Sequence, residues 1–265
     1  MCLILLAWRV HPEFPCVLAA NRDEFHERET AAADWWSGAA GILAGRDLHA
    51  GGTWLGVTRR GQFAALTNFR DGGVRRAIAP SRGMLVSELL ESGRSVPESL
   101  RHLEREGPRY NPFNILFSDG RGLAIYESAL GEGRELGPGV FGLSNHLLDT
   151  PWPKVENAKS ALTAALADPR DTDAILHLLR DDRRAGDGDL PRTGATLEWE
   201  RLLSSAFVRA PDYGTRCSSL FRVDQRGAAV FHEWSWDRRG EASGTRCFEF
   251  AIEGSDAEGF DAPAA

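Results

Sequence analysis

The chain has 265 residues and a formal net charge of −7, and it contains no basic block, so nothing in its charge supports binding to the phosphate backbone of a nucleic acid. Hydrophobic residues make up 42% and charged residues 26% of the chain, which is typical of a globular protein and excludes global disorder. No segment approaches the roughly 18 apolar residues that a spanning helix requires, so we expect no membrane span.

The cysteines and histidines do not form a metal-binding pattern. The four cysteines contain no CxxC pair, and no two of the seven histidines stand three or four residues apart. We therefore predict no metal site and no covalently attached haem. The apolar opening of residues 3–8 is too short for a secretory signal and lacks a basic segment before it. We expect a cytoplasmic protein whose thiols stay reduced.

Two hairpins are predicted in the first 70 residues. Residues 2–10 and 16–20 are apolar and flank a turn centred near Glu13, which predicts an antiparallel pair with Cys2 opposite Glu24, to within about two residues. Residues 53–58 and 63–68 predict a second hairpin. The chain end is thereby expected beside residues 21–24.

The remaining elements suggest one layered domain. Helical patterns and strand patterns alternate in groups: helices at 81–91 and 97–105, strands at 114–117, 123–127 and 140–145, about three helices within 153–207, and a three-stranded meander over 217–252. This grouping favours an α+β fold over a βαβ alternation. Because no linker or internal repeat is visible, we predict a single domain over residues 1–252 and a flexible tail at 253–265.

Cys2 is the first candidate for chemistry. If Met1 is removed, Cys2 supplies both a thiol, which is nucleophilic as the thiolate, and an α-amino group with a pKa near 7.7–8.0 that can accept the thiol proton. One residue then provides nucleophile and base. The alternative is that Cys2 is a small apolar residue that begins a strand, which is the commoner role of a cysteine in isolation.

The polar residues 21–24 end the strand that is predicted beside Cys2. Asp23 would orient the α-amino group, and Arg22 would lower the pKa of the thiol. Successive strand side chains point to opposite faces, so both can face Cys2 only if the strand ends there or a bulge intervenes. The alternative for these four residues is a solvated loop.

Three polar residues and two tryptophans complete the candidate set. Asn68 and Asn145 end predicted strands, where an amide can donate to an oxyanion or cap a turn. Arg216 opens a late strand and can hold a carboxylate or stabilise a thiolate. Trp54 and Trp152 are expected in core packing, with contact to a bound acyl chain or porphyrin as the alternative.

Eight sequence blocks carry a family resemblance. They are residues 1–4 (MCLI), 21–24 (NRDE), 44–48 (AGRDL), 51–56 (GGTWLG), 64–68 (AALTN), 142–145 (GLSN), 148–154 (LDTPWPK) and 213–216 (YGTR). Together they resemble the NRDE family, which is the family of the transport-and-Golgi-organisation protein two, from Met1 to about Ile252.

The resemblance implies a fold similar to that of the N-terminal-nucleophile hydrolases, namely a four-layer αββα sandwich of two mostly antiparallel sheets. It also implies a pocket whose catalytic residues are Cys2, Arg22, Asp23, Asn68, Asn145 and Arg216, with Asn21, Trp54 and Trp152 contacting the substrate. In the related acylases, two residues separate the early arginine from the aspartate. Arg22 and Asp23 are adjacent here, which leaves the role of Asp23 open.

Two functions follow as hypotheses. The first is hydrolysis or transfer of an acyl group on a small-molecule amide or thioester through Cys2, with no resident cofactor. The alternative is a non-catalytic carrier or chaperone that binds haem or an acyl-coenzyme A lipid in the same pocket, with His49 or His146 as a candidate haem ligand. The sequence leaves the substrate and the oligomeric state open.

Overall fold

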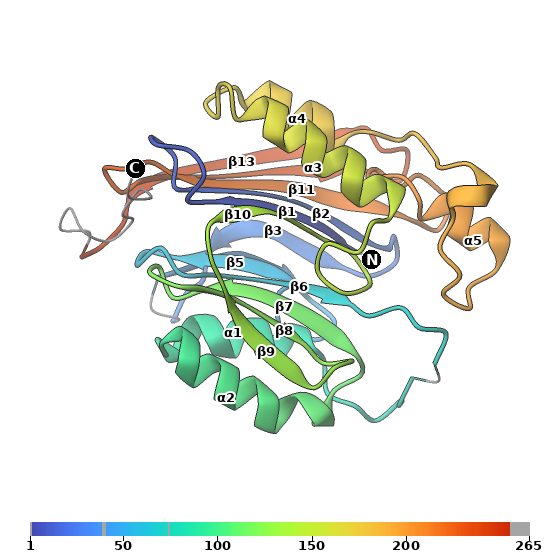
Figure 1. Cartoon of the computed structure of the whole chain (residues 1–265), viewed down its shortest axis with the longest axis horizontal. Coiled ribbons are helices and arrows are strands. Elements are labelled where there is room, and N and C mark those ends of the chain that lie inside the picture. Colours follow the sequence, from blue (N-terminus) through green and yellow to red (C-terminus); the bar gives the residue numbers. More distant parts are fainter. Residues whose placement is uncertain (1, 39–40, 74, 255–265) are drawn as a thin grey trace.

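Two antiparallel β-sheets lie face to face between two layers of helices (Figure 1). The computed structural model describes residues 2–38, 41–73 and 75–254. The α+β, four-layer αββα arrangement predicted from the sequence is confirmed.

The first sheet contains both ends of the described chain. Within the described residues it has six strands in the order β10 (Gly139–Leu143), β1 (Cys2–Trp8), β2 (Cys16–Phe25), β11 (Tyr213–Val223), β12 (Ala228–Trp236) and β13 (Ala242–Ala251). Helices α3 (Pro153–Ala165) and α4 (Thr172–Leu179) cover its outer face (Figure 1), and α5 (Leu197–Leu202) lies beyond them. β1 is buried on both faces, which explains its unbroken apolar sequence.

The second sheet follows the chain order. Its seven described strands are β3 (Thr30–Trp35), β4 (Ile42–Asp47), β5 (Leu55–Thr58), β6 (Phe63–Asn68), β7 (Phe113–Ser118), β8 (Leu123–Glu127) and β9 (Glu132–Leu136). Helices α1 (Gly83–Ser92) and α2 (Val96–Glu106) cover its outer face. The Glu98 carboxylate accepts a hydrogen bond from the Ser95 N–H (2.9 Å), which helps to begin α2 where the sequence predicts a helix.

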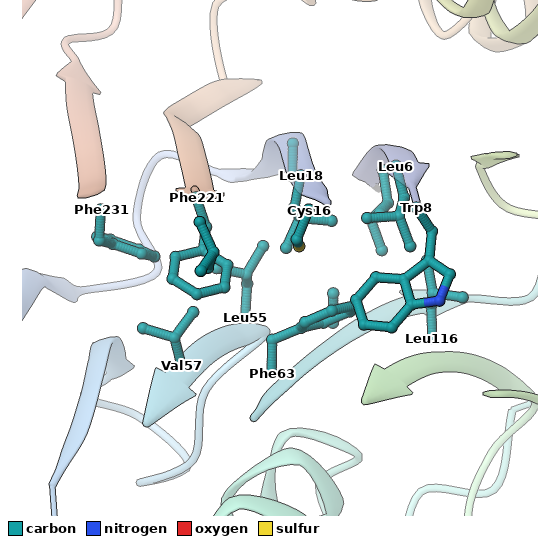
Figure 2. Close-up of a cluster of buried hydrophobic side chains, with 14 of the residues drawn as sticks. Leu6, Trp8, Cys16, Leu18, Leu55, Val57, Phe63, Leu116, Phe221 and Phe231 are labelled. Atoms are coloured by element: carbon teal, nitrogen blue, oxygen red, sulfur yellow. The ribbon is translucent and has the colours of Figure 1, made fainter. Parts of the chain in front are cut away.

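The core between the sheets is aromatic and aliphatic. Leu6, Leu18 and Phe221 of the first sheet face Leu55 and Phe63 of the second (Figure 2). Two further apolar clusters fill the spaces between each sheet and its helices. The two sheets bury one shared cluster, which supports the prediction of one domain over residues 1–252.

The first hairpin forms as predicted, and its register lies within the two residues that the prediction allowed. Trp8 pairs with Cys16, and Cys2 pairs with Arg22 rather than with Glu24. The turn is therefore centred at Pro12, not Glu13. In an antiparallel hairpin, a shift of the turn centre by one residue moves the residue opposite Cys2 by two. β2 also continues to Phe25, so residues 21–24 form a strand and the alternative of a solvated loop is wrong.

The tail lies mostly outside the described residues. Glu253 and Gly254 form a turn after β13, and residues 255–265 are not described. Among the helices that the structure describes, none combines the length and the apolar character needed to cross a membrane.

Candidate active site

Cys2 begins β1 at one end of the two sheets. Its side chain points to the same face as Ile4 and Leu6, into the space between the sheets. The Asp23 backbone N–H acts to lower the pKa of the Cys2 thiol. On the other side, the Ser144 hydroxyl donates to the Cys2 carbonyl (3.1 Å). The strand pairing and this bond thus fix the backbone that carries the thiol.

A cavity of about 470 Å³ opens beside this thiol. Residues from both sheets line it: Cys2, Arg22, Asp23 and Glu24 from the first, and Trp54, Leu66 and Asn68 from the second or from the loop before it. The segment that leads into α1, from Ala79 to Gly83, closes another side. The cavity therefore lies where the open ends of the two sheets meet.

Arg22 is almost fully buried beside Cys2. Its guanidinium lies over the Trp54 ring, 4.4 Å from the ring centroid, and donates to the Thr30 hydroxyl (3.2 Å). The positive charge lowers the pKa of the Cys2 thiol. Burial acts more strongly in the opposite direction, and the Asp23 charge adds to it, so the pKa of Cys2 lies above its ordinary value. The resting group is a thiol that needs a base.

Asp23 lies on the opposite side of β2 from Arg22. Its carboxylate accepts a hydrogen bond from the Thr215 hydroxyl (2.7 Å), and its carbonyl accepts one from the Tyr213 hydroxyl (3.0 Å). Burial raises the pKa of this carboxyl group. The neighbouring strand β11 contains a bulge at Arg216, between Thr215 and Cys217. Arg22 and Asp23 both line the cavity because it opens at the end of the sheet, where both faces of β2 are within reach.

Lys154 is a charged neighbour that the sequence analysis did not propose. It lies in the first turn of α3 and is 5% exposed. Burial lowers its pKa to about 8, while the charges of Asp23 and Cys2 act to raise it. Its rarity could have drawn attention to it, because Lys154 is one of only two lysines among the 31 basic residues.

Arg82 is a second residue that the sequence analysis missed. It precedes α1, lines the cavity, and donates to the Pro112 carbonyl (3.1 Å). Burial lowers its pKa to about 10, and the Cys2 charge acts on it in the opposite direction. Nothing in its sequence context distinguishes it from other arginines that precede helices.

Asn68 and Asn145 differ in their position relative to the cavity. Asn68 lines the cavity. Asn145 is fully buried and is not among the lining residues; its side-chain amide donates to the Asn68 carbonyl (2.8 Å), and its own carbonyl accepts from the Arg70 N–H (2.7 Å). Asn145 therefore holds the strand end that carries Asn68.

Replacing Asn145 by Ala is expected to lower the free energy of unfolding by about 1–3 kcal/mol, because the Asn68 carbonyl loses its buried donor. Urea unfolding followed by tryptophan fluorescence measures the change. Asn157→Ala, at an exposed position of α3, is the control and should change stability by less than about 0.5 kcal/mol. Equal stability of the two variants would contradict the structural role of Asn145.

Arg216 and Asn21 do not line the cavity. The Arg216 guanidinium donates to the carbonyls of Phe25, His26 and Arg28, so it fixes the turn that follows β2. Asn21 faces the helical layer, where its amide donates to the carbonyls of Leu179 (2.7 Å) and Ala206 (2.8 Å).

The two tryptophans are also separated. Trp54 lines the cavity beneath Arg22. Trp152 is buried at the beginning of α3, with the Arg70 guanidinium 4.9 Å from its ring centroid, and it is not a lining residue. Of the two histidines considered as haem ligands, His49 lines the cavity, whereas His146 stacks on Phe69 (5.0 Å between ring centroids).

Comparison with known proteins places the chain in a family. The family model described as Transport and Golgi organisation 2 matches residues 1–238. The Transport and Golgi organization protein 2 homolog of Bos taurus is 37% identical over 89% of this chain and 93% of its own length. The corresponding Homo sapiens protein is 34% identical and covers 96% of this chain over 100% of its own length.

A solved structure shows the same fold. It is a C2A mutant of the conjugated bile acid hydrolase from Clostridium perfringens, with a TM-score of 0.54, 11% sequence identity, and coverage of 94% of this chain and 92% of that one. This likeness confirms the predicted similarity to the N-terminal-nucleophile hydrolase fold. Since the family model covers most of its length and relatives above 30% identity cover nearly all of it, the chain belongs to the Transport and Golgi organisation 2 family.

Proposed function

We propose that the protein hydrolyses or transfers an acyl group on a small-molecule amide or thioester, through an acyl-enzyme formed on Cys2 after removal of Met1. Met1 itself lies outside the described residues. The observation that supports the proposal is the position of Cys2 at the beginning of β1, in a cavity that it lines together with Arg22, Asp23 and Asn68.

The chemistry begins with a protonated thiol, because burial raises the pKa of Cys2. The α-amino group that Met1 removal would free accepts the thiol proton, and Asp23 orients the resulting ammonium group. The sulfur attacks the carbonyl carbon, and the amide of Asn68, a residue that lines the cavity, donates to the oxyanion that forms. Collapse breaks the bond to the amine or thiol, which takes the proton, and water or another acceptor then cleaves the thioester.

The solved neighbour adds support. It is named a hydrolase, and the form solved is one in which the cysteine at its second position is replaced by alanine. A cysteine therefore occupies the same chain position in that enzyme as Cys2 does here. All four cysteines of this chain are free, and free thiols persist in a reducing compartment such as the cytoplasm.

The carrier hypothesis draws less support from the cavity. Its lining is largely charged or polar, including Arg22, Arg28, Arg82 and Asp47, whereas sites for extended apolar ligands are lined mainly by hydrophobic and aromatic side chains. His49 is the lining histidine that could ligate haem iron. A micromolar haem titration that gives a saturable Soret shift, lost in His49→Ala, would favour the carrier.

Mass spectrometry of the intact protein tests the enzyme proposal. We expect the purified chain to lack Met1 and, after incubation with short-chain acyl thioesters and anilides, to carry an added acyl mass that maps to Cys2. Cys2→Ala should lose the adduct and at least about a thousandfold in turnover, as expected for loss of a nucleophile. Cys247→Ser, at an exposed thiol on β13, is the control and should keep both. Full turnover by Cys2→Ala, or by protein that retains Met1, would contradict the proposal.

A further inference from the structure

The cavity beside Cys2 contains guanidinium groups that form no direct ion pair, although the carboxylates of Asp23 and Glu24 also line it. Arg28 is paired with Asp47 (2.7 Å). Arg22 and Arg82 form no ion pair with a carboxylate of the described residues: Arg22 stacks on Trp54 and bonds to Thr30, and Arg82 bonds to a backbone carbonyl. Two cations without a direct ion pair therefore line the cavity, one on β2 and one at the beginning of α1.

Of the two, Arg82 has the greater capacity for a ligand. Its hydrogen bond to the Pro112 carbonyl uses one N–H, and the other N–H donors of the planar guanidinium remain able to bind a ligand. It remains protonated at neutral pH, since its pKa of about 10 is still well above 7. The Glu24 charge acts on Arg82 without a direct ion pair, and an anion bound to the guanidinium would offset more of the cost of burying it.

The beginning of α1 adds to the positive potential. Gly83, its first residue, lines the cavity, and the first turn carries neither an acidic residue nor a side-chain cap. The positive end of the helix dipole therefore points toward the same space as Arg82. Cys2 lies in this space as well, and the charge of its thiolate, once formed, interacts favourably with that of Arg82.

We propose that Arg82 binds an oxyanionic group of the substrate, a carboxylate or a phosphate, close to the carbonyl that Cys2 attacks. Bidentate binding by the guanidinium would orient the substrate and select acidic acyl donors over neutral ones. The proposal rests on the proposed function in that Cys2 is taken as the reacting atom. It goes beyond that function because it specifies the charge of the substrate and the residue that recognises this charge.

Paired alkylating reagents test the proposal without any turnover. Iodoacetate and iodoacetamide both form an S–C bond to the thiolate and release iodide, but only iodoacetate is anionic. We measure the rate of each at Cys2 by peptide mapping at low ionic strength, with Cys247 as the internal reference. The ratio of the iodoacetate rate to the iodoacetamide rate is expected to fall about tenfold in Arg82→Gln, as for loss of one charge-assisted contact. Arg82→Lys should keep part of the preference.

Arg101→Gln, at an exposed position of α2, is the matched control and should keep the parent ratio. Thermal unfolding shows whether the Arg82 variants remain folded. A ratio unchanged in folded Arg82→Gln overturns the proposal. In a second experiment, the rate of Cys2 labelling by iodoacetamide is measured in the parent with inorganic phosphate or acetate added. If one of these anions slows the labelling in the parent but not in Arg82→Gln, the result supports the proposal and identifies the anion. Protection by neither contradicts it.

The two proposals fail separately. A charge preference at Cys2 in a protein that never forms an acyl adduct would refute the enzyme proposal and leave the anion site standing. Acyl transfer from neutral and acidic donors at equal kcat/KM, in both the parent and Arg82→Gln, would refute the anion site alone.

Discussion

Between pH 7 and pH 10.5 the free energy of unfolding of the parent protein is expected to rise by about 3 kcal/mol relative to that of Lys154→Met. The cause is the burial that lowers the pKa of Lys154 from the ordinary 10.5 to about 8. Below pH 8 the folded state carries a desolvated charge. Between pH 8 and 10.5 the unfolded chain still binds this proton while the folded chain does not, so stability rises with pH.

Urea unfolding across this pH range measures the difference. Thiols and tyrosines whose pKa values are raised by burial act in the opposite direction at the alkaline end, but they are present in both proteins and cancel in the comparison. Lys159→Met removes the other lysine, on the same helix, where it is paired with Asp149 (2.7 Å), and serves as the control. A difference between parent and Lys154→Met that stays flat or falls with pH would contradict the assignment.

The free-energy cost of burying the Lys154 charge suggests that this charge has a function. Lys154 occupies the first turn of α3, where the helix dipole also disfavours a cation. Its charge lowers the pKa of Asp23, whose burial raises it. In the proposed mechanism Asp23 must be ionised to orient an ammonium group. Lys154 is thus placed to keep Asp23 ionised without contacting the substrate.

The sequence predicted the elements whose patterns are strong. Both early hairpins, α1, α2 and the last meander follow from apolar runs, turn residues and caps. It missed β3, whose TAAADW sequence is rich in alanine and has little strand preference, and β9, an exposed edge strand with charged residues. It also missed β4, whose short ILAGRD sequence contains a glycine and two charged residues and so has little strand preference.

The site was predictable where it depends on local spacing. The hairpin brings Cys2 to Arg22 because both lie on strands joined by one short turn. Arg82 and Lys154 arrive from segments far along the chain, and only the tertiary fold determines which of 31 basic residues reach the cavity. The bulge at Arg216 lies on a third strand, so the spacing of residues 21–24 alone could not reveal it.

Asp23→Asn is expected to lower the rate of acyl transfer by about a hundredfold to ten-thousandfold, the range for loss of a group that supports proton transfer. The variant keeps the shape of the side chain and leaves the backbone unchanged, so its main effect is to remove the charge. Labelling of Cys2 by iodoacetamide at alkaline pH should be preserved. That result would separate loss of the proton-transfer partner from loss of the thiol.

The pH profile and a neighbouring variant make this test specific to the Asp23 charge. Burial raises the pKa of Asp23, so activity that needs the ionised form is lost as pH falls through a value above the ordinary range of aspartate, and this acid limb should vanish in Asp23→Asn. Thr215→Val removes the hydroxyl that donates to the carboxylate but keeps the charge, and should cost less activity. Parent-like rates in Asp23→Asn would show that the carboxylate next to Arg22 takes no part in acyl transfer. The α-amino group of Cys2 would then need another residue to orient it.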